Sequence, residues 1–193
     1  MATAAPEIKP DYSSRKRHFC FTDEHEALRE SIQSFAAKEL APHSAEWEET
    51  GFPDSVFTRM GELGFLGIYF PEEYGGQGGD YLMSIVRGEA MAYANNGGLV
   101  MGVAVHTDMA TPPILKFGSE ELKQRYLVPA IKGEKISSLG ITEPGAGSDV
   151  AGVRTRAVRD GDEYVINGSK TFITNGARAD FIVLVTKTEP DAG

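Results

Sequence analysis

The sequence is poor in cysteine and in positive charge, and each shortage narrows the possibilities. Its single cysteine, Cys20, excludes an internal disulfide framework and fits a reducing compartment. Because Cys20 lies between two phenylalanines and ahead of any helix, we expect a buried, inert thiol rather than a nucleophile. The 19 basic and 28 acidic residues leave a net charge of −9, which argues against nucleic-acid binding because phosphate neutralisation requires a basic surface.

Long hydrophobic runs are also lacking. No window holds the ~18 uninterrupted apolar residues of a transmembrane helix, so we expect no membrane span. The first twenty residues lack the apolar core of a secretory signal and contain proline and acidic residues. We therefore expect a flexible tail over residues 1–20 and a cytoplasmic protein, or a mitochondrial matrix protein if the source is eukaryotic.

The pattern of the chain changes near residue 133. Residues 22–132 carry apolar side chains at helical spacing, whereas residues 136–188 form short β-compatible segments. The predicted fold class is therefore α+β. We expect an N-terminal all-α helical bundle over residues 21–133, followed by the start of an antiparallel, barrel-like β-domain over residues 134–193.

Start and stop signals divide the helical part. The first helix begins near Thr22 and its pattern ends at Pro42; the second begins at Pro53 and ends at Gly64. A glycine-rich loop follows, but it lacks the lysine of a phosphate-binding loop and the strand–GxGxxG–helix order of a dinucleotide fold. We interpret it as a tight loop in which Asp80 caps the next helix.

The sequence offers no metal site. His106 lies in a segment that is apolar on nearly every side, and no second histidine or cysteine stands at ligand spacing. It is therefore expected in the core. In the strand part, Asp160-Gly161-Asp162 predicts a hairpin, Thr171–Thr174 is expected to be a strand, and the apolar run Phe181–Val185 predicts a strand buried on both faces.

Two segments carry most of the chemical information, ITEPGAGSDVAG at residues 141–152 and GSKTFITNG at residues 168–176. They offer threonine hydroxyls, glycine-flanked backbone N–H groups and one aromatic face, which suit a flat, partly polar ring such as a flavin. Threonine and phenylalanine are nevertheless common in strands, and glycine is common in turns. The residues alone therefore leave a flavin site and ordinary strand structure about equally open.

The two segments resemble those of the acyl-CoA dehydrogenase family, which places them against FAD. The resemblance extends over nearly the whole chain from about residue 19 and includes the run FGSEELK at residues 117–123. The helical part is most similar to the long-chain and isovaleryl-like branches. Phe172 stands where many members have tryptophan, which keeps an aromatic cover but removes the indole N–H.

The resemblance implies a set of site residues. Ser148 would also contact the acyl-CoA substrate, Thr142 would lie near the pyrimidine edge of the flavin, and Thr174 would lie toward N5. Glu143 and Asp149 are expected to belong to the architecture of the first segment rather than to act as the base. The implied FAD-binding residues are Leu139, Ile141, Thr142, Gly147, Ser148, Phe172, Ile173 and Thr174.

The family reaction is α,β-dehydrogenation of acyl-CoA thioesters to trans-2-enoyl-CoA, in fatty acid or branched-chain acyl-CoA breakdown. The family takes its catalytic glutamate from a C-terminal helical domain. The sequence ends at Gly193, so we expect the base beyond it, assign no catalytic residue here and expect residues 1–193 alone to be inactive. The implied partners are an electron-transfer flavoprotein and further copies of the chain. An acyl-CoA oxidase on the same fold and a truncated, non-catalytic binding or assembly module stay open as alternatives.

Overall fold

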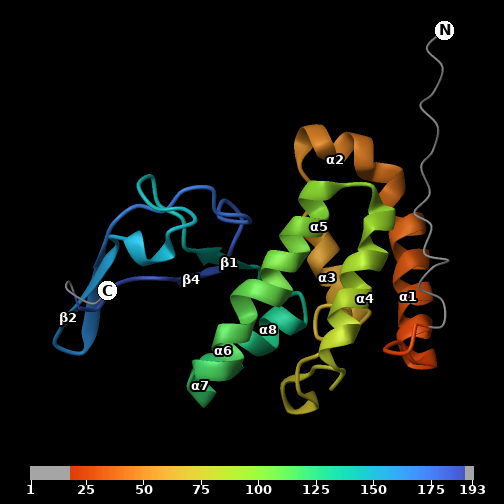
Figure 1. Ribbon diagram of the computed structural model, residues 1–193, viewed down its shortest axis with the longest axis horizontal. Coiled ribbons are helices and arrows are strands. Elements are labelled where there is room, and N and C mark those ends of the chain that lie inside the picture. Colours follow the sequence, from red (N-terminus) through yellow and green to blue (C-terminus); the bar gives the residue numbers. More distant parts are fainter. Residues whose placement is uncertain (1–17, 190–193) are drawn as a thin grey trace, which may run out of the picture. The chain divides into compact units, whose positions relative to one another are not determined.

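The computed structural model describes residues 18–189, in which helices precede strands (Figure 1). Most of the predicted tail lies outside these residues. The chain forms two compact units: one runs up to Phe52 and includes Gly79–Val100, and the other comprises Pro53–Gly78 and the residues from Met101 onward. No helix within residues 18–189 has both the length and the apolar character needed to cross a membrane.

The first unit is built on two helices that pack against each other, α1 (Asp23–Phe35) and α4 (Tyr81–Met91). Asp80 accepts a hydrogen bond from the Met83 N–H at 2.9 Å, which confirms that it caps α4. The buried His25 accepts from the backbone N–H of Thr22 through Nδ1 and lies 3.1 Å from Asp80 through Nε2. The N-termini of the two helices are therefore joined by one imidazole.

The prediction that the first helical pattern ends at Pro42 is wrong. After α1 the chain continues through a π-helical segment, η2 (Ala36–Leu40), and a 3₁₀ turn, η3 (Ala41–His43), into α2 (Ser44–Thr50). Pro42 lies in the first positions of the 3₁₀ turn, where its missing N–H has no helical partner to lose. The first unit is completed by η5 (Ala92–Ala94) and the start of α5 (Gly97–Ala104).

Cys20 is half-exposed rather than buried, in the short turn before α1. Its Sγ lies 2.9 Å from Nδ1 of His18. The expectation of a buried thiol is therefore wrong.

The second unit contains the remaining helices around a core of aromatic and aliphatic side chains. Phe70, Tyr74, Leu127 and Ile131 form this cluster, and each contributes about 1.5–3 kcal/mol when fully buried. Besides the end of α5, the helices are α3 (Ser55–Glu62), η4 (Glu72–Tyr74), the π-helical η6 (Val105–Ala110), α6 (Thr111–Phe117), α7 (Glu120–Leu122), the π-helical η7 (Lys123–Leu127), α8 (Val128–Ile131) and the 3₁₀ turn η8 (Val150–Gly152).

Gly133 marks the change from helices to strands that the sequence predicts. Its φ of +72° favours glycine, and a Cβ built there would lie 2.1 Å from the carbonyl oxygen of Phe57. Close contact between α3 and this turn therefore requires glycine.

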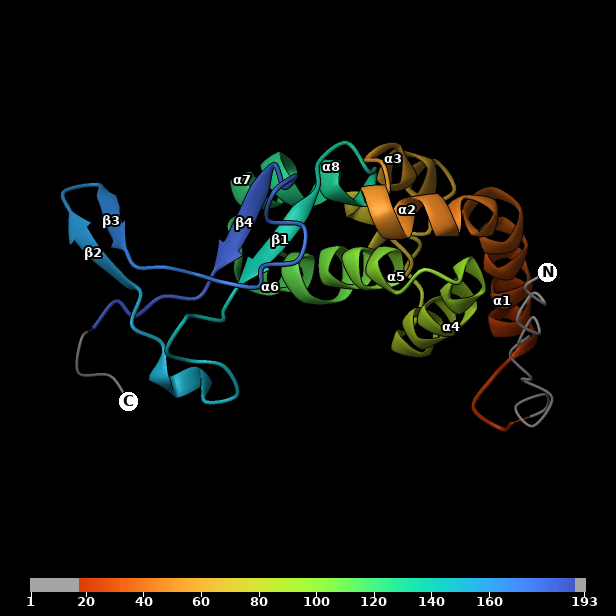
Figure 2. The same ribbon diagram turned by 90° about the horizontal axis from the view of Figure 1, so that it is seen from above.

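The strands form two separate pairs. β2 (Arg156–Asp160) and β3 (Glu163–Asn167) make the predicted antiparallel hairpin. β1 (Ser137–Gly140) and β4 (Phe181–Leu184) pair in parallel and lie side by side in Figure 2. We expected antiparallel pairing throughout, but the connection between β1 and β4 is long enough to bring the chain back in the same direction.

Two details of the strand prediction are wrong. Thr171–Thr174 is not a strand, because Phe172 and Asn175 adopt φ angles of +55° and +64° that break extended backbone. β4 is not buried on both faces: Ile182 is 48% exposed, and β4 has only β1 as a neighbour among the described strands.

Candidate functional site

The two segments singled out in the sequence lie against each other. The backbone N–H of Thr171 donates to the carbonyl oxygen of Thr142 at 2.9 Å, and Nζ of Lys170 donates to that of Ile141 at the same distance. At the other end, Oγ of Ser138 in β1 donates to the carbonyl oxygen of Thr174 at 2.7 Å. Residues 138–142 and 170–174 are therefore joined by hydrogen bonds near both ends.

Glu143 is the centre of this arrangement. Its Oε1 accepts hydrogen bonds from Nζ of Lys170 and from both the N–H and the hydroxyl of Thr155, and its Oε2 accepts from the N–H of Arg154. The Glu143 and Lys170 side chains are only 7% and 9% exposed. One buried carboxylate thus ties the first segment, the second segment and the chain entering β2 together.

The surroundings of Glu143 are unfavourable for a general base. The Lys170 ammonium, the Thr155 hydroxyl and the Arg154 N–H stabilise the ionised form and hold the pKa of the Glu143 carboxyl far below its ordinary range. A carboxylate with so low a pKa and with four donors already bound has little tendency to take a proton from a substrate. The structure agrees with the expected architectural role of this residue.

The low pKa of Glu143 makes a prediction about pH. Because the folded-state pKa lies below the ordinary value of 4.5, the stabilisation is complete above pH 4.5 and is lost as the pH falls toward the lower folded value. Urea unfolding of the wild type and of Glu143→Gln at pH 7 and at pH 3 measures this. At pH 7 the wild type should have a larger free energy of unfolding than Glu143→Gln. This difference between the two proteins should be smaller at pH 3; an equal difference at both pH values would contradict the low pKa of Glu143.

Phe172 has an unusual conformation for an aromatic residue. It is 90% exposed, and its φ of +55° lies in the left-handed region, which costs about 1–2 kcal/mol for a residue with a side chain. The flanking hydrogen bonds of Thr171 and Thr174 hold this conformation. A strained backbone that presents a large apolar ring to solvent is a feature of binding sites.

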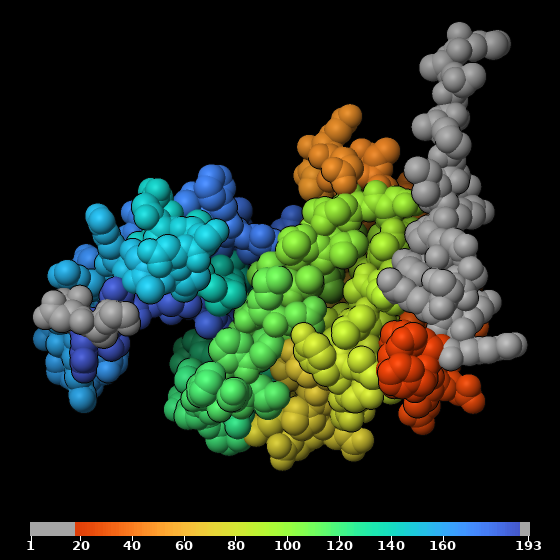
Figure 3. Space-filling model, in the orientation of Figure 1, coloured from red at the N-terminus to blue at the C-terminus, as the bar shows by residue number. Residues whose placement is uncertain are grey.

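The other predicted site residues fall into two groups. Leu139, Ile141, Thr142, Ile173 and Thr174 are half-buried along the joined segments. Gly147 and Ser148 are exposed at the far end of the first segment, coloured teal to cyan in Figure 3. Within residues 18–189 no hydrogen bond links Gly147 or Ser148 to the second segment, and a Cβ built at Gly147 would meet open space. The structure therefore brings together the first group but not the second.

Four residues that support the site were not assigned by the sequence: Ser138, Thr155, Lys170 and Asn175. Lys170 and Asn175 stand inside the second segment, but nothing local indicates that their side chains point inward. Their partners are 27 to 73 positions away. Only the folded chain brings these groups within hydrogen-bonding distance.

His106 is a core residue, as predicted. Its Nδ1 lies 3.0 Å from the donating N–H of Ser137, so the imidazole proton is on Nε2, which donates to the Ala130 carbonyl oxygen at 3.0 Å. The ring contacts Phe57 edge to face. Within residues 18–189 there is no cluster of three histidine, cysteine or acidic residues that could hold a metal ion.

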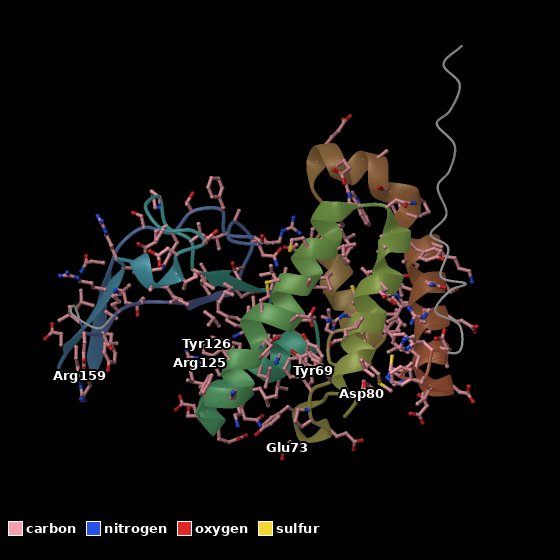
Figure 4. The ribbon with its side chains drawn as sticks, in the orientation of Figure 1. Tyr69, Glu73, Asp80, Arg125, Tyr126 and Arg159 are labelled. Atoms are coloured by element: carbon pink, nitrogen blue, oxygen red, sulfur yellow. The ribbon has the colours of Figure 1, made fainter. Side chains whose placement is uncertain are left out.

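A separate apolar pocket of about 420 Å³ lies between α6, η7 and β4. Tyr126, labelled in Figure 4 beside Arg125, forms one wall, and its ring centroid lies 5.1 Å from that of Phe181. The exposed Phe117 and Leu122 also line the pocket. The sequence did not indicate this pocket, because its walls come from segments about 60 residues apart.

Two family models match the chain. The model for the acyl-CoA dehydrogenase N-terminal domain matches residues 22–134. The model for the acyl-CoA dehydrogenase middle domain matches residues 138–193. The change from helices to strands falls between the two matches.

Known proteins of the same description are similar over most of the chain. The chain is 43% identical over 172 residues to "Probable acyl-CoA dehydrogenase YngJ" of Bacillus subtilis (strain 168), which covers 89% of the chain and 45% of that protein. The crystal structure of acyl-CoA dehydrogenase from Geobacillus kaustophilus superposes with a TM-score of 0.83 at 44% identity, covering 89% of this chain and 45% of that one.

A third match is the crystal structure of acyl-CoA dehydrogenase complexed with FAD from Bacillus anthracis. Its TM-score is 0.81 at 36% identity, and the match covers 86% of this chain and 29% of that one. The chain thus spans less than half the length of each of these proteins. Together the matches confirm the predicted fold class.

Proposed function

This chain belongs to the acyl-CoA dehydrogenase family, and we propose that the protein is an FAD-dependent oxidoreductase that dehydrogenates acyl-CoA thioesters to trans-2-enoyl-CoA. Acyl-CoA would be its substrate and an electron-transfer flavoprotein its electron acceptor. We further propose a homo-oligomer in the cytoplasm, or in the mitochondrial matrix if the source is eukaryotic.

The exposed, left-handed Phe172 carries the proposal for the cofactor. A flat ring that covered its face would remove a large apolar surface from water and would account for the strained backbone that presents it. The half-buried Thr142 and Thr174 lie on the same joined segments and carry hydroxyl groups suited to the polar edge of a ring. An exposed aromatic ring and hydroxyl groups on the same segments suit an isoalloxazine ring, which has flat apolar faces and a polar edge.

Different residues on these segments would contact different parts of FAD. Leu139, Ile141 and Ile173 would contact the ring through side chains or backbone, and Gly147 and Ser148 would lie where cofactor and substrate meet. FAD, when bound, supplies the acceptor for the hydride that leaves the β-carbon of the substrate. Glu143 would not take the α-proton, because its carboxylate is already bound by four donors.

The test of this proposal is FAD binding by the wild type and by Phe172→Gly. Loss of the aromatic face should weaken FAD binding roughly 10- to 100-fold, which corresponds to about 1.5–3 kcal/mol of lost apolar burial. The melting temperature of the cofactor-free protein should be unchanged or higher, because glycine adopts a φ of +55° without strain. Titration of FAD fluorescence and a thermal melt measure the two quantities.

Phe117→Ala is the matched control, because Phe117 is also exposed (77%) but lies in α6. This variant should bind FAD like the wild type. Equal affinities of the wild type and Phe172→Gly would overturn the assignment of Phe172. A wild-type protein that keeps no flavin absorbance near 450 nm after incubation with FAD and removal of the unbound FAD would overturn the proposed cofactor.

A further inference from the structure

Asn175 occupies the turn at the end of the second segment, and its side chain reaches out of that turn. Its Nδ2 donates to the carbonyl oxygen of Gly102 in α5 at 2.8 Å and to that of Ser137 in β1 at 3.3 Å. Both partners are acceptors only, so the amide nitrogen must face them. One side chain therefore joins a loop, a helix and a strand.

The backbone of Asn175 is equally constrained. Its φ is +64°, a left-handed conformation that asparagine tolerates better than most residues. Its carbonyl oxygen accepts from the N–H groups of both Arg178 and Ala179 at 2.9 Å, and the N–H of Gly176 donates to Ile173. Backbone hydrogen bonds thus hold the turn together, and the Asn175 amide attaches it to α5 and β1.

The helix that Asn175 contacts is itself irregular. After Ala104, α5 becomes the π-helical segment η6, and its carbonyl oxygens accept from side chains as well as from the backbone. Oγ1 of Thr107 donates to Val103, and Oγ1 of Thr111 donates to His106 and Thr107. Asn175 adds a further side-chain donor to this helix, at the carbonyl oxygen of Gly102.

We infer that Asn175 is a positioning residue: by fixing the turn to α5 and β1, it holds Phe172 and Thr174 in the geometry that receives FAD. This inference rests on the proposed function. Only two residues separate Phe172 from Asn175, and the carbonyl group of Thr174 is held by Ser138. The positions of the aromatic ring and of Thr174 therefore depend on the point where the turn is attached.

The geometry suggests two variants that remove the contact in different ways. Asn175→Gly keeps the left-handed backbone without strain but removes both hydrogen bonds. Asn175→Asp keeps the shape of the side chain but places a carboxylate against two carbonyl oxygens. If the amide positions the site, both variants should weaken FAD binding about tenfold or more, and the aspartate variant should be the weaker binder.

Asn95→Gly is the matched control. Asn95 is also left-handed, with a φ of +52°, but it is exposed and its side-chain amide forms no hydrogen bond within residues 18–189. The substitution therefore makes the same backbone change without removing a positioning contact. We expect its FAD affinity to equal that of the wild type.

The experiment combines FAD titration of the whole protein, a thermal melt without FAD, and hydrogen exchange of the Gly176 and Ala179 amides. We expect faster exchange of both amides and weaker FAD binding in Asn175→Gly, with a melting temperature close to that of Asn95→Gly.

One result would show that Asn175 is merely structural and that the inference is wrong: Asn175→Gly melts at a lower temperature but binds FAD with wild-type affinity while folded. Wild-type affinity together with unchanged exchange would also overturn it. If the wild type itself binds no FAD, the proposed function fails, and the exchange of the two amides still decides whether Asn175 holds the turn.

Discussion

Glu143→Ala should disrupt the arrangement of the two site segments more severely than any other single change to a polar residue of this site. The substitution removes the acceptor of the Arg154 and Thr155 N–H groups and of the Thr155 hydroxyl, and it leaves the Lys170 ammonium buried without its counter-ion. Removing one member of a buried ion pair is strongly destabilising, because the remaining charge keeps its desolvation penalty. We expect the strand part to lose its cooperative unfolding transition.

Hydrogen exchange at Arg154 and Thr155 and circular dichroism melts measure this effect. Asp149→Ala is the matched control, because Asp149 is the other carboxylate of the same segment and is exposed. This control should keep the exchange protection of Thr155 and melt close to the wild type. Full protection of the Arg154 and Thr155 amides in Glu143→Ala would show that the carboxylate does not hold the segments together.

His106→Ala should lower the free energy of unfolding by about 3–5 kcal/mol. The loss combines a cavity in the core with the buried Ser137 N–H, which loses its hydrogen-bond partner; the Ala130 carbonyl loses one of two donors and keeps the Gly133 N–H. Because Ser137 begins β1, the effect should reach the strand that leads into the first site segment. Denaturant unfolding at pH 7 measures the change.

His43→Ala is the control for this experiment. His43 is exposed and stacks on Trp47, with ring centroids 5.0 Å apart, so its loss should cost only about 1 kcal/mol or less. A change below about 1 kcal/mol for His106→Ala would contradict the central position assigned to this imidazole. Faster hydrogen exchange at the Ser137 amide in His106→Ala would confirm that the substitution also destabilises β1.

Local signals in the sequence were reliable where one residue type satisfies a local requirement. Asp80 was predicted to cap α4 and does so, because a carboxylate beside free N–H groups needs no distant partner. The hairpin around Gly161 was predicted for the same reason. Such features depend on neighbours within a few positions along the chain.

Local signals failed where packing overrides propensity. Pro42 was predicted to end a helical path that continues through a 3₁₀ turn into α2. In α4, the apolar Ile85 is 41% exposed, whereas the charged Arg87 is buried. An apolar stripe indicates only that a helix packs, and the partner elements decide which side is covered.

The sequence by itself determined the order of helices and strands, the position of the change near Gly133 and, through its two segments, the family. These features follow from residue type and short-range spacing, which do not change when the chain folds. Only the tertiary structure decided that β1 and β4 run in parallel, that Glu143 is saturated by Lys170 and Thr155 rather than free to act as a base, and that Asn175 attaches the second segment to α5. Each of these depends on groups 12 to 73 positions apart, which only the folded chain brings into contact.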